Sequence, residues 1–209
     1  MSTVIPFDQA GADLALAQLR AGAIIAFPTD TVYGVGGNAL DGAAILQVFA
    51  AKQRLPSVPL PILLADVADL ALVAAHVPAL AYAIAAAHWP GALTLVLPAA
   101  AHLPPELLAG NRTVAVRIPD HAALRQLIRD LGAPLAGTSA NRHGQPAPSS
   151  AAGVEAQLGG RVPLILDGGP SGADQPSTIL DLSGASPRVL REGALPLAAL
   201  RQWLEKEIE

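Results

Sequence analysis

The segment Pro28–Gly34 (PTDTVYG) concentrates side chains that can bind a polar ligand. It carries three hydroxyl groups, on Thr29, Thr31 and Tyr33, together with one carboxylate. The residues before it, Ala23–Phe27, form a short apolar run that predicts a buried strand. Because ligands usually bind where the strands of an α/β sheet end, this segment is a candidate binding loop. The same residues also fit an ordinary polar turn that is capped by its own threonine and aspartate side chains.

Positively charged side chains that suit anion binding lie near the ends of other predicted elements. Lys52 and Arg54 follow a predicted helix, and Lys52 is one of only two lysines in the chain. Both also fit plain cations at a helix C-terminus, where each would contribute about 0.3–1 kcal/mol. Thr113 and Arg117 are four residues apart on a predicted strand, so alternation places both on one face. An arginine on an apolar strand needs an anionic partner, because burying it unpaired is costly.

Hydroxyl and amide side chains accompany these cations. Thr138, Ser139 and Asn141 follow a short predicted strand, and they equally fit a simple serine–asparagine turn. Ser177 precedes another predicted strand, and Arg191 follows the last one. Guanidinium, ammonium and hydroxyl groups together suit phosphate or carboxylate ligands.

Other chemistries find less support in the sequence. Gly34, Gly36 and Ala39 satisfy the G-x-G-x-x-G/A pattern of dinucleotide-binding proteins, and Asp66 ends the next predicted strand. In those proteins the glycines follow the first strand directly, whereas PTDTVY intervenes here. The pattern G-x-x-x-x-G-K-[ST] is absent, no Ser-His-Asp arrangement is evident, and the five histidines lack the spacing of metal ligands. The absence of cysteine excludes thiolate zinc sites and a cysteine nucleophile.

Composition restricts the class of protein. The chain has 209 residues, 52% of them hydrophobic and only 3% aromatic, which suits one domain with a substantial core of small aliphatic side chains. This apolar content excludes a disordered chain. The formal net charge of −4 disfavours a generally basic nucleic-acid-binding protein but allows a local basic cleft.

Two segments bear on the location of the protein. Leu70–Pro105 contains no Asp, Glu, Lys or Arg, yet prolines, a glycine and histidines interrupt it. No window of about 20 strongly apolar residues survives, so we predict buried helix and strand there. Met1–Asp8 lacks the basic and apolar regions of a signal peptide. We therefore expect a cytoplasmic protein with no membrane contact.

Helical patterns alternate with predicted strands along the chain. Asp8, Asp41 and Asp120 are expected to cap helices, and Gly22 and Gly132 to end two of them. The helices are predicted over residues 8–21, 41–51, 66–75, 79–88, 120–131, 151–158 and 196–207. The strands are predicted over residues 23–27, 62–65, 92–97, 113–118, 135–137, 162–166, 178–182 and 188–190. This alternation indicates a single α/β domain over residues 1–209, with the helix at 196–207 closing it.

Eight short strings occur in an order that resembles the YrdC-like threonylcarbamoyl-AMP synthase family in its short, TsaC-type form. They are FPTDTVYG, AKQR, WPGALTLVL, TVAVRIPDH, TSAN with Gly144 and Pro146 after it, DGG, PSTI and LREG. The resemblance covers nearly the whole chain. It implies a twisted mixed sheet, flanked by helices, around a large and positively lined cavity.

The same resemblance implies an activity and partners. Family members are nucleotidyltransferases that condense L-threonine, bicarbonate or CO₂, and ATP into threonylcarbamoyl-adenylate, with release of pyrophosphate. That product serves the formation of N6-threonylcarbamoyladenosine at position 37 of tRNA. We expect Mg²⁺ to arrive with ATP rather than on protein ligands. Separate proteins are expected to complete the transfer to tRNA, and direct RNA contact is left open.

The resemblance also assigns roles to individual residues. It implies a catalytic group of Lys52, Arg54, Ser139 and Asn141. It implies ATP binding by Arg54, Thr113, Ser139 and Arg191, and threonine binding by Thr31, Arg117 and Ser177, with Thr29, Tyr33 and Thr138 as further candidates. Two positions depart from the family pattern: Val58 stands where relatives often have Asn, and Leu63 where they often have His. A nucleotide contact and a threonine contact are therefore altered or replaced.

Two other functions are compatible with the sequence. A non-catalytic RNA-binding module would use the same basic cavity, although the net acidity and the lack of basic runs disfavour it. A dinucleotide-binding oxidoreductase would rest on the glycine pattern at 34–39. Pyrophosphate release that depends on L-threonine distinguishes the synthase from both.

Overall fold

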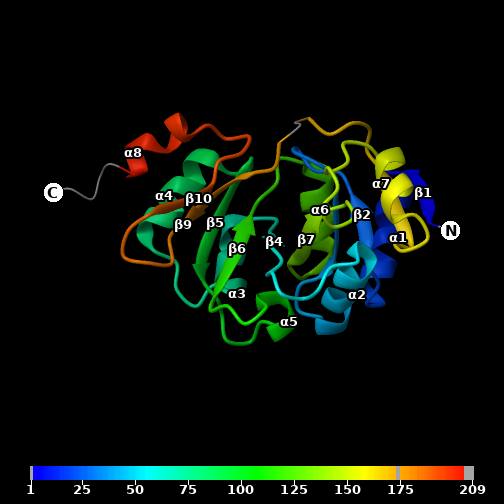
Figure 1. Ribbon diagram of the computed structural model, residues 1–209, viewed down its shortest axis with the longest axis horizontal. Coiled ribbons are helices and arrows are strands. Elements are labelled where there is room, and N and C mark those ends of the chain that lie inside the picture. Colours follow the sequence, from blue (N-terminus) through cyan, green and yellow to red (C-terminus); the bar gives the residue numbers. More distant parts are fainter. Residues whose placement is uncertain (1, 173–174, 205–209) are drawn as a thin grey trace.

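In the computed structural model, which describes residues 2–172 and 175–204, ten strands form one mixed sheet that runs across the molecule (Figure 1). The strands are β1 (Thr3–Pro6), β2 (Ile25–Phe27), β3 (Gly34–Asn38), β4 (Ile62–Leu63), β5 (Leu93–Pro98), β6 (Thr113–Arg117), β7 (Leu135–Ser139), β8 (Leu164–Asp167), β9 (Thr178–Asp181) and β10 (Arg188–Arg191). Their order in the sheet is β1-β8-β2-β3-β7-β4-β6-β5-β9-β10. Parallel and antiparallel pairs both occur, which confirms the predicted α/β class with a mixed sheet.

Helices flank this sheet. They are α1 (Gln9–Arg20), α2 (Gly42–Lys52), α3 (Leu70–Val73), α4 (Ala79–His88), α5 (Pro105–Leu108), α6 (Ala122–Leu131), α7 (Ala151–Leu158) and α8 (Arg201–Leu204), with 3₁₀ turns at Val67–Asp69 and Leu197–Leu200. Asp8 and Asp41 cap α1 and α2 as predicted: the side chain of Asp8 accepts from Gly11 N, and that of Asp41 accepts from Ala43 N and Ala44 N.

Alternating side chains of β2 enter two different apolar clusters. Ile25 and Phe27 pack with residues of α1 and α6, whereas Ala26 belongs to the larger cluster that includes residues of α2, α4 and α7. Successive residues of a strand point to opposite faces, so the sheet is covered on both sides here. Because both faces are buried, every residue of β2 is apolar.

Several predicted elements need correction. Strands β1 and β3 and helix α5 were not expected; β3 (GVGGN) is rich in glycine, which has little intrinsic strand preference, and its pairing with β2 and β7 stabilises it instead. The N-cap of α6 is His121 rather than Asp120, since Nδ1 of His121 accepts from Leu124 N at 3.2 Å.

Two predicted helices are shorter than expected. The one predicted over residues 66–75 is a 3₁₀ turn followed by the four-residue α3, and Ala74 is already extended. The one predicted over residues 196–207 consists of a 3₁₀ turn and α8 up to Leu204; residues 205–207 lie outside the described part of the chain.

The glycine pattern at 34–39 does not form a dinucleotide-binding turn, because Gly34 and Gly36 lie within β3. Gly36 pairs with Gly137 of β7, where the two backbones approach closely. A Cβ at Gly36 would lie 1.9 Å from the carbonyl oxygen of Ala136. The glycine at this position therefore serves strand packing.

No helix in the described ranges has both the length and the apolar character needed to cross a membrane.

We predict that Gly36→Ala lowers the free energy of unfolding by more than about 3 kcal/mol, because a backbone atom of β7 blocks the added methyl group. Urea denaturation measures the change. Gly184→Ala is the matched control, since nothing lies within 4 Å of its Cβ position, and it should change stability by less than about 0.5 kcal/mol. Equal stabilities for the two variants would contradict the prediction.

Candidate active site

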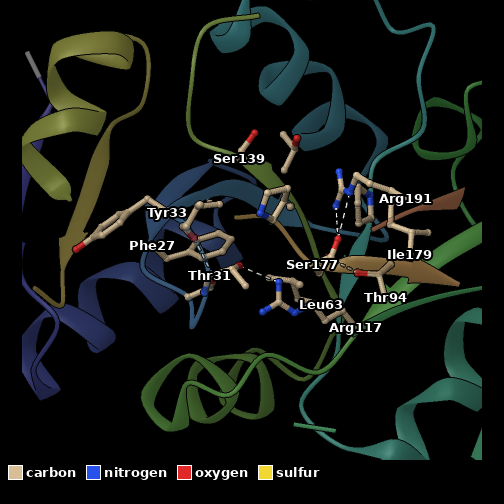
Figure 2. Close-up of a pocket in the computed structure, with 17 residues that line it drawn as sticks. Phe27, Thr31, Tyr33, Leu63, Thr94, Arg117, Ser139, Ser177, Ile179 and Arg191 are labelled. Carbon is tan, nitrogen blue, oxygen red and sulfur yellow. Dashed lines mark hydrogen bonds between the residues drawn. The ribbon is translucent and has the colours of Figure 1, made fainter. Parts of the chain in front are cut away.

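A cavity of about 160 Å³ lies across the strands of the sheet (Figure 2). One row of cross-strand neighbours lines it. Leu63 pairs with Arg117, the register of β5 and β6 places Thr94 beside Arg117, and Ile179 pairs with both Thr94 and Arg191. Neighbours across strands point to the same face. The pairing of β4, β6, β5, β9 and β10 therefore brings together residues that are far apart in the sequence.

Phe27 forms another wall of the cavity because the strands beside it lack side chains there. A Cβ at Gly34 would lie 2.6 Å from the Phe27 ring, and one at Gly137 would lie 3.2 Å from it. The ring consequently lies against the backbone of β3 and β7. Ser139, the cross-strand partner of Gly34, also lines the cavity.

Arg117 is the buried cation of the cavity, with an exposed fraction of 6%. Its Nε donates to the Gly91 carbonyl oxygen at 2.9 Å, one terminal nitrogen donates to Thr31 Oγ1 at 3.0 Å, and the other forms an ion pair with Asp30. A guanidinium has five N–H groups, so two have no partner among the described residues. A carboxylate or phosphate that enters the cavity can accept hydrogen bonds from them.

Arg191 approaches the same cavity from the edge of the sheet. The register of β9 and β10 shifts between Val189 and Arg191, and such a bulge changes the direction of a side chain. Nε and one terminal nitrogen of Arg191 both donate to the carbonyl oxygen of Ser177, at 3.1 and 2.8 Å (Figure 2). Burial lowers the pKa of Arg191, and the positive charge of Arg117 adds to the effect. An anion between the two arginines would relieve this repulsion.

Hydroxyl groups complete the cavity. Ser177 Oγ and Thr94 Oγ1 are 2.7 Å apart, and both residues are buried. Tyr33 contributes its ring to the lining, but its hydroxyl points away from Arg117 (Figure 2). That hydroxyl donates to the Gly169 carbonyl oxygen at 2.6 Å, and burial raises its pKa. Tyr33 therefore supports the loop after β8.

Lys52 does not line the cavity, and only 2% of its surface is exposed. Its ammonium donates to the carbonyl oxygens of Ser139 and Asn141 and to Asn141 Oδ1. Burial lowers the pKa of Lys52 to about 8, and the charge of Arg54 adds to this. Its contacts join α2 to the end of β7, at Ser139, and to the loop that follows, at Asn141.

Arg54 follows helix α2, whose last residue is Lys52. The residue between them, Gln53, has a left-handed conformation with φ 54° and ends the helix. The Arg54 guanidinium lies 5.9 Å from the centre of the Phe49 ring, and its Nε is buried without a hydrogen-bond partner. Burial lowers the pKa of Arg54. This guanidinium is thus available to an anion.

The structure brings most of the candidate residues together. Those that line the cavity are Thr29, Thr31, Tyr33, Arg117, Thr138, Ser139, Ser177 and Arg191. Lys52, Arg54, Asn141 and Thr113 are not part of its lining; Thr113 lies four residues before Arg117 on β6, about 13 Å along the strand. The roles assigned to all of the candidate residues, inside and outside the lining, stay predictions.

Sequence reasoning missed Phe27, Thr94 and Ile179 as lining residues. Thr94 had one available signal, because it is the polar residue inside the apolar string LTLVL. Only the strand pairing shows that it faces the cavity.

We predict that Asp30→Asn lowers the free energy of unfolding by about 3 kcal/mol, because it leaves a buried guanidinium without its counter-charge. The side chains of Arg117 and Asp30 are only 7% and 15% exposed. Arg188→Gln breaks an ion pair in which the arginine is 72% exposed, and it should cost less than about 1 kcal/mol. Chemical denaturation of both variants checks the difference, and similar losses would refute the assigned burial.

We predict that Lys52 makes the free energy of unfolding increase with pH in the alkaline range. Its folded pKa of about 8 lies below the ordinary 10.5, so between these values the unfolded chain binds more protons at this site. Its contribution to stability therefore rises with pH. Between pH 7.5 and 10, the unfolding free energy of the wild type should increase by about 2 kcal/mol relative to Lys52→Met. Parallel pH profiles for the two proteins would contradict this.

The sequence matches the Sua5/YciO/YrdC family, described as telomere recombination, over residues 17–193. A threonylcarbamoyl-AMP synthase of Bacillus subtilis is 42% identical over 182 residues, which cover 87% of this chain and 53% of that protein. A putative threonylcarbamoyl-AMP synthase of Mycobacterium tuberculosis is 40% identical over 190 residues, covering 91% and 87%. This chain thus spans about half the length of the B. subtilis relative.

A solved structure has the same fold. Pyrococcus abyssi Sua5 complexed with L-threonine superimposes with a TM-score of 0.92 at 38% identity, over 98% of this chain and 60% of that one. Together with the sequence match, this confirms the resemblance inferred from the eight strings. The chain belongs to the Sua5/YciO/YrdC family.

Proposed function

We propose that this chain is an L-threonylcarbamoyladenylate synthase, a nucleotidyltransferase that uses L-threonine, bicarbonate or CO₂, and ATP. The observation that carries the proposal is the cavity around Arg117, in a chain similar to a Sua5 that was solved with L-threonine. The cavity volume of about 160 Å³ is smaller than the 300–1,000 Å³ of pockets for drug-sized ligands. It suits an amino acid, so the nucleotide would extend beyond it.

Threonine binding would use the polar and apolar sides of the cavity together. The two N–H groups of Arg117 that have no partner among the described residues would bind the carboxylate in a bidentate manner. Thr31 and Ser177 would contact the remaining polar groups of the substrate. Leu63, where relatives often have His, adds an apolar contact in place of a polar one.

ATP would bind along the cationic side of the cavity. Arg54 has a buried Nε without a hydrogen-bond partner and would contact a phosphate. Arg191 would release the carbonyl oxygen of Ser177 and bind a second phosphate. Ser139 would orient the nucleotide, while the contacts of Lys52 with the carbonyl oxygens of Ser139 and Asn141 would hold the end of β7 in place. Thr113 is the least supported of the proposed ATP contacts because of its distance from Arg117 along β6.

Mg²⁺ would be carried by the triphosphate. The described residues contain no group of three or more His, Cys, Asp or Glu side chains that could hold a metal ion. Triphosphate oxygens and water are ligands that Mg²⁺ favours. When bound, the ion would neutralise phosphate charge.

The reaction would proceed in two steps. The neutral amine of threonine adds to CO₂ and loses a proton, which gives a carbamate. A carbamate oxygen then attacks the α-phosphorus of ATP, and the bond to pyrophosphate breaks. Both reactants of the second step are anions, so the arginines act by positioning them and neutralising their charge.

The product would serve the threonylcarbamoyl modification of tRNA in the cytoplasm, with further proteins completing the transfer. The alternative of a non-catalytic RNA-binding module has less support, because the net charge is −4 and Arg117 and Arg191 converge on one small cavity rather than forming an extended basic surface. The placement of the glycine pattern within β3 also removes the main argument for a dinucleotide-binding enzyme.

We predict pyrophosphate release that requires L-threonine, bicarbonate, ATP and Mg²⁺ together. Arg54→Ala should lower kcat/KM at least about 100-fold, as expected when a transition-state charge contact is lost. The far-UV circular dichroism spectrum of the variant should match that of the wild type. Arg161→Ala removes an exposed arginine and should leave the rate unchanged. Release without threonine would refute the proposed reaction, and equal rates for the two variants would refute the role of Arg54.

A further inference from the structure

Two adjacent hydroxyl groups at the cavity, on Thr29 and Thr31, are linked by a set of hydrogen bonds that fixes their direction. The two oxygens are 3.0 Å apart, and the residues are 8% and 2% exposed. Thr29 Oγ1 donates to the Val32 carbonyl oxygen at 2.7 Å. It also accepts from the backbone N–H of Thr31 at 3.1 Å. Thr31 Oγ1 accepts from Arg117 at 3.0 Å.

A proton count settles which hydroxyl donates between them. A hydroxyl has one proton and two acceptor lone pairs. The Val32 carbonyl oxygen can only accept, so it takes the proton of Thr29. The hydrogen bond between the two threonines must therefore be donated by Thr31. Thr31 then has no proton left, and Arg117 occupies one of its lone pairs.

We propose that Thr29 is a positioning residue that makes Thr31 an acceptor-only group toward the substrate. Thr31 lines the cavity and has one unused lone pair among the described contacts. It would accept a hydrogen bond from an N–H or O–H of the bound amino acid. This inference rests on the proposed function and adds to it a role for Thr29, which would act through Thr31.

The arrangement places an obligatory acceptor beside an obligatory donor. Arg117 can only donate, and its terminal nitrogen is 3.0 Å from Thr31 Oγ1. An amino acid has a carboxylate, which can accept from Arg117, and an adjacent amine, which can donate to Thr31. If Thr31 accepts from one N–H of the neutral amine, the lone pair of the amine nitrogen stays free to attack CO₂. A hydroxyl free to rotate would instead also donate to that lone pair.

The test measures L-threonine binding by titration calorimetry for the wild type, Thr29→Val and Thr29→Ser. Valine has the shape of threonine but no oxygen, so Thr31 regains a free proton; serine keeps the oxygen. We expect about tenfold weaker binding for Thr29→Val, the effect of about 1.4 kcal/mol, and near wild-type binding for Thr29→Ser. Ser183→Ala is the control, since its hydroxyl bonds Asp181 at 2.6 Å outside the cavity lining.

Two analogues separate this role from a merely structural one. L-2-aminobutyrate lacks the hydroxyl of threonine, and (R)-3-hydroxybutyrate, which has the C3 configuration of L-threonine, lacks the amine. If Thr31 accepts from the amine, Thr29→Val weakens aminobutyrate binding and spares hydroxybutyrate; if it accepts from the hydroxyl, the pattern reverses. Either pattern supports the proposal. Equal losses for all three ligands, or no loss for any, would overturn it.

The pyrophosphate assay keeps the two proposals distinguishable. An active wild type whose threonine binding is insensitive to Thr29→Val overturns the role of Thr29 alone. A protein that binds threonine in the expected Thr29-dependent way but releases no pyrophosphate overturns the proposed reaction alone. A wild type that does not bind L-threonine overturns both.

Discussion

The burial of one guanidinium within an apolar sheet is the constraint on which this site depends. Arg117 ends β6 among aliphatic neighbours, and an unpaired charge there would be strongly destabilising. Oxygens from two distant segments compensate it: Asp30 and Thr31 after β2, and Gly91 before β5. These contacts fix the loop after β2 and the turn before β5 against the end of β6. The same interactions that stabilise the cation therefore also set the walls of the cavity.

Positive charge in this protein acts by position rather than by amount. The chain is acidic overall, with a net charge of −4, yet Arg117 and Arg191 line one small cavity. Burial lowers the pKa of Arg191, and the charge of Arg117 adds to this effect. Lys52 adds a third cation, which donates a hydrogen bond to the carbonyl oxygen of Ser139 at the end of β7. Charges that are partly removed from water are screened less by salt than exposed ones. An acidic protein can therefore still bind anions at one place.

The sequence predicts the local features well and the long-range ones poorly. Asp8 and Asp41 were recognisable as helix caps, and the apolar run before Pro28 as a strand, because each depends on neighbouring residues. Strand β3 was not recognisable, because its glycines are explained by close contact with β7 and the Phe27 ring. Nor was the orientation of Lys52, which follows from carbonyl oxygens more than 80 residues further along the chain, at Ser139 and Asn141. The row that contains Thr94 and Ile179 follows from strand order, which no local pattern encodes.

The two hydroxyl pairs at the cavity differ in what they can offer a ligand. In the Thr29–Thr31 pair the direction of donation is fixed, because the Val32 carbonyl oxygen takes one proton and the Thr31 backbone N–H and Arg117 supply others. In the Thr94–Ser177 pair neither hydroxyl has a second side-chain hydrogen bond among the described contacts, so either can donate. The fixed pair lies beside the charged donor Arg117, where a wrong hydrogen-bond direction would be costly. Thr94 is also a cross-strand neighbour of Arg117, but no described hydrogen bond joins them, so this pair can present either a donor or an acceptor to a ligand.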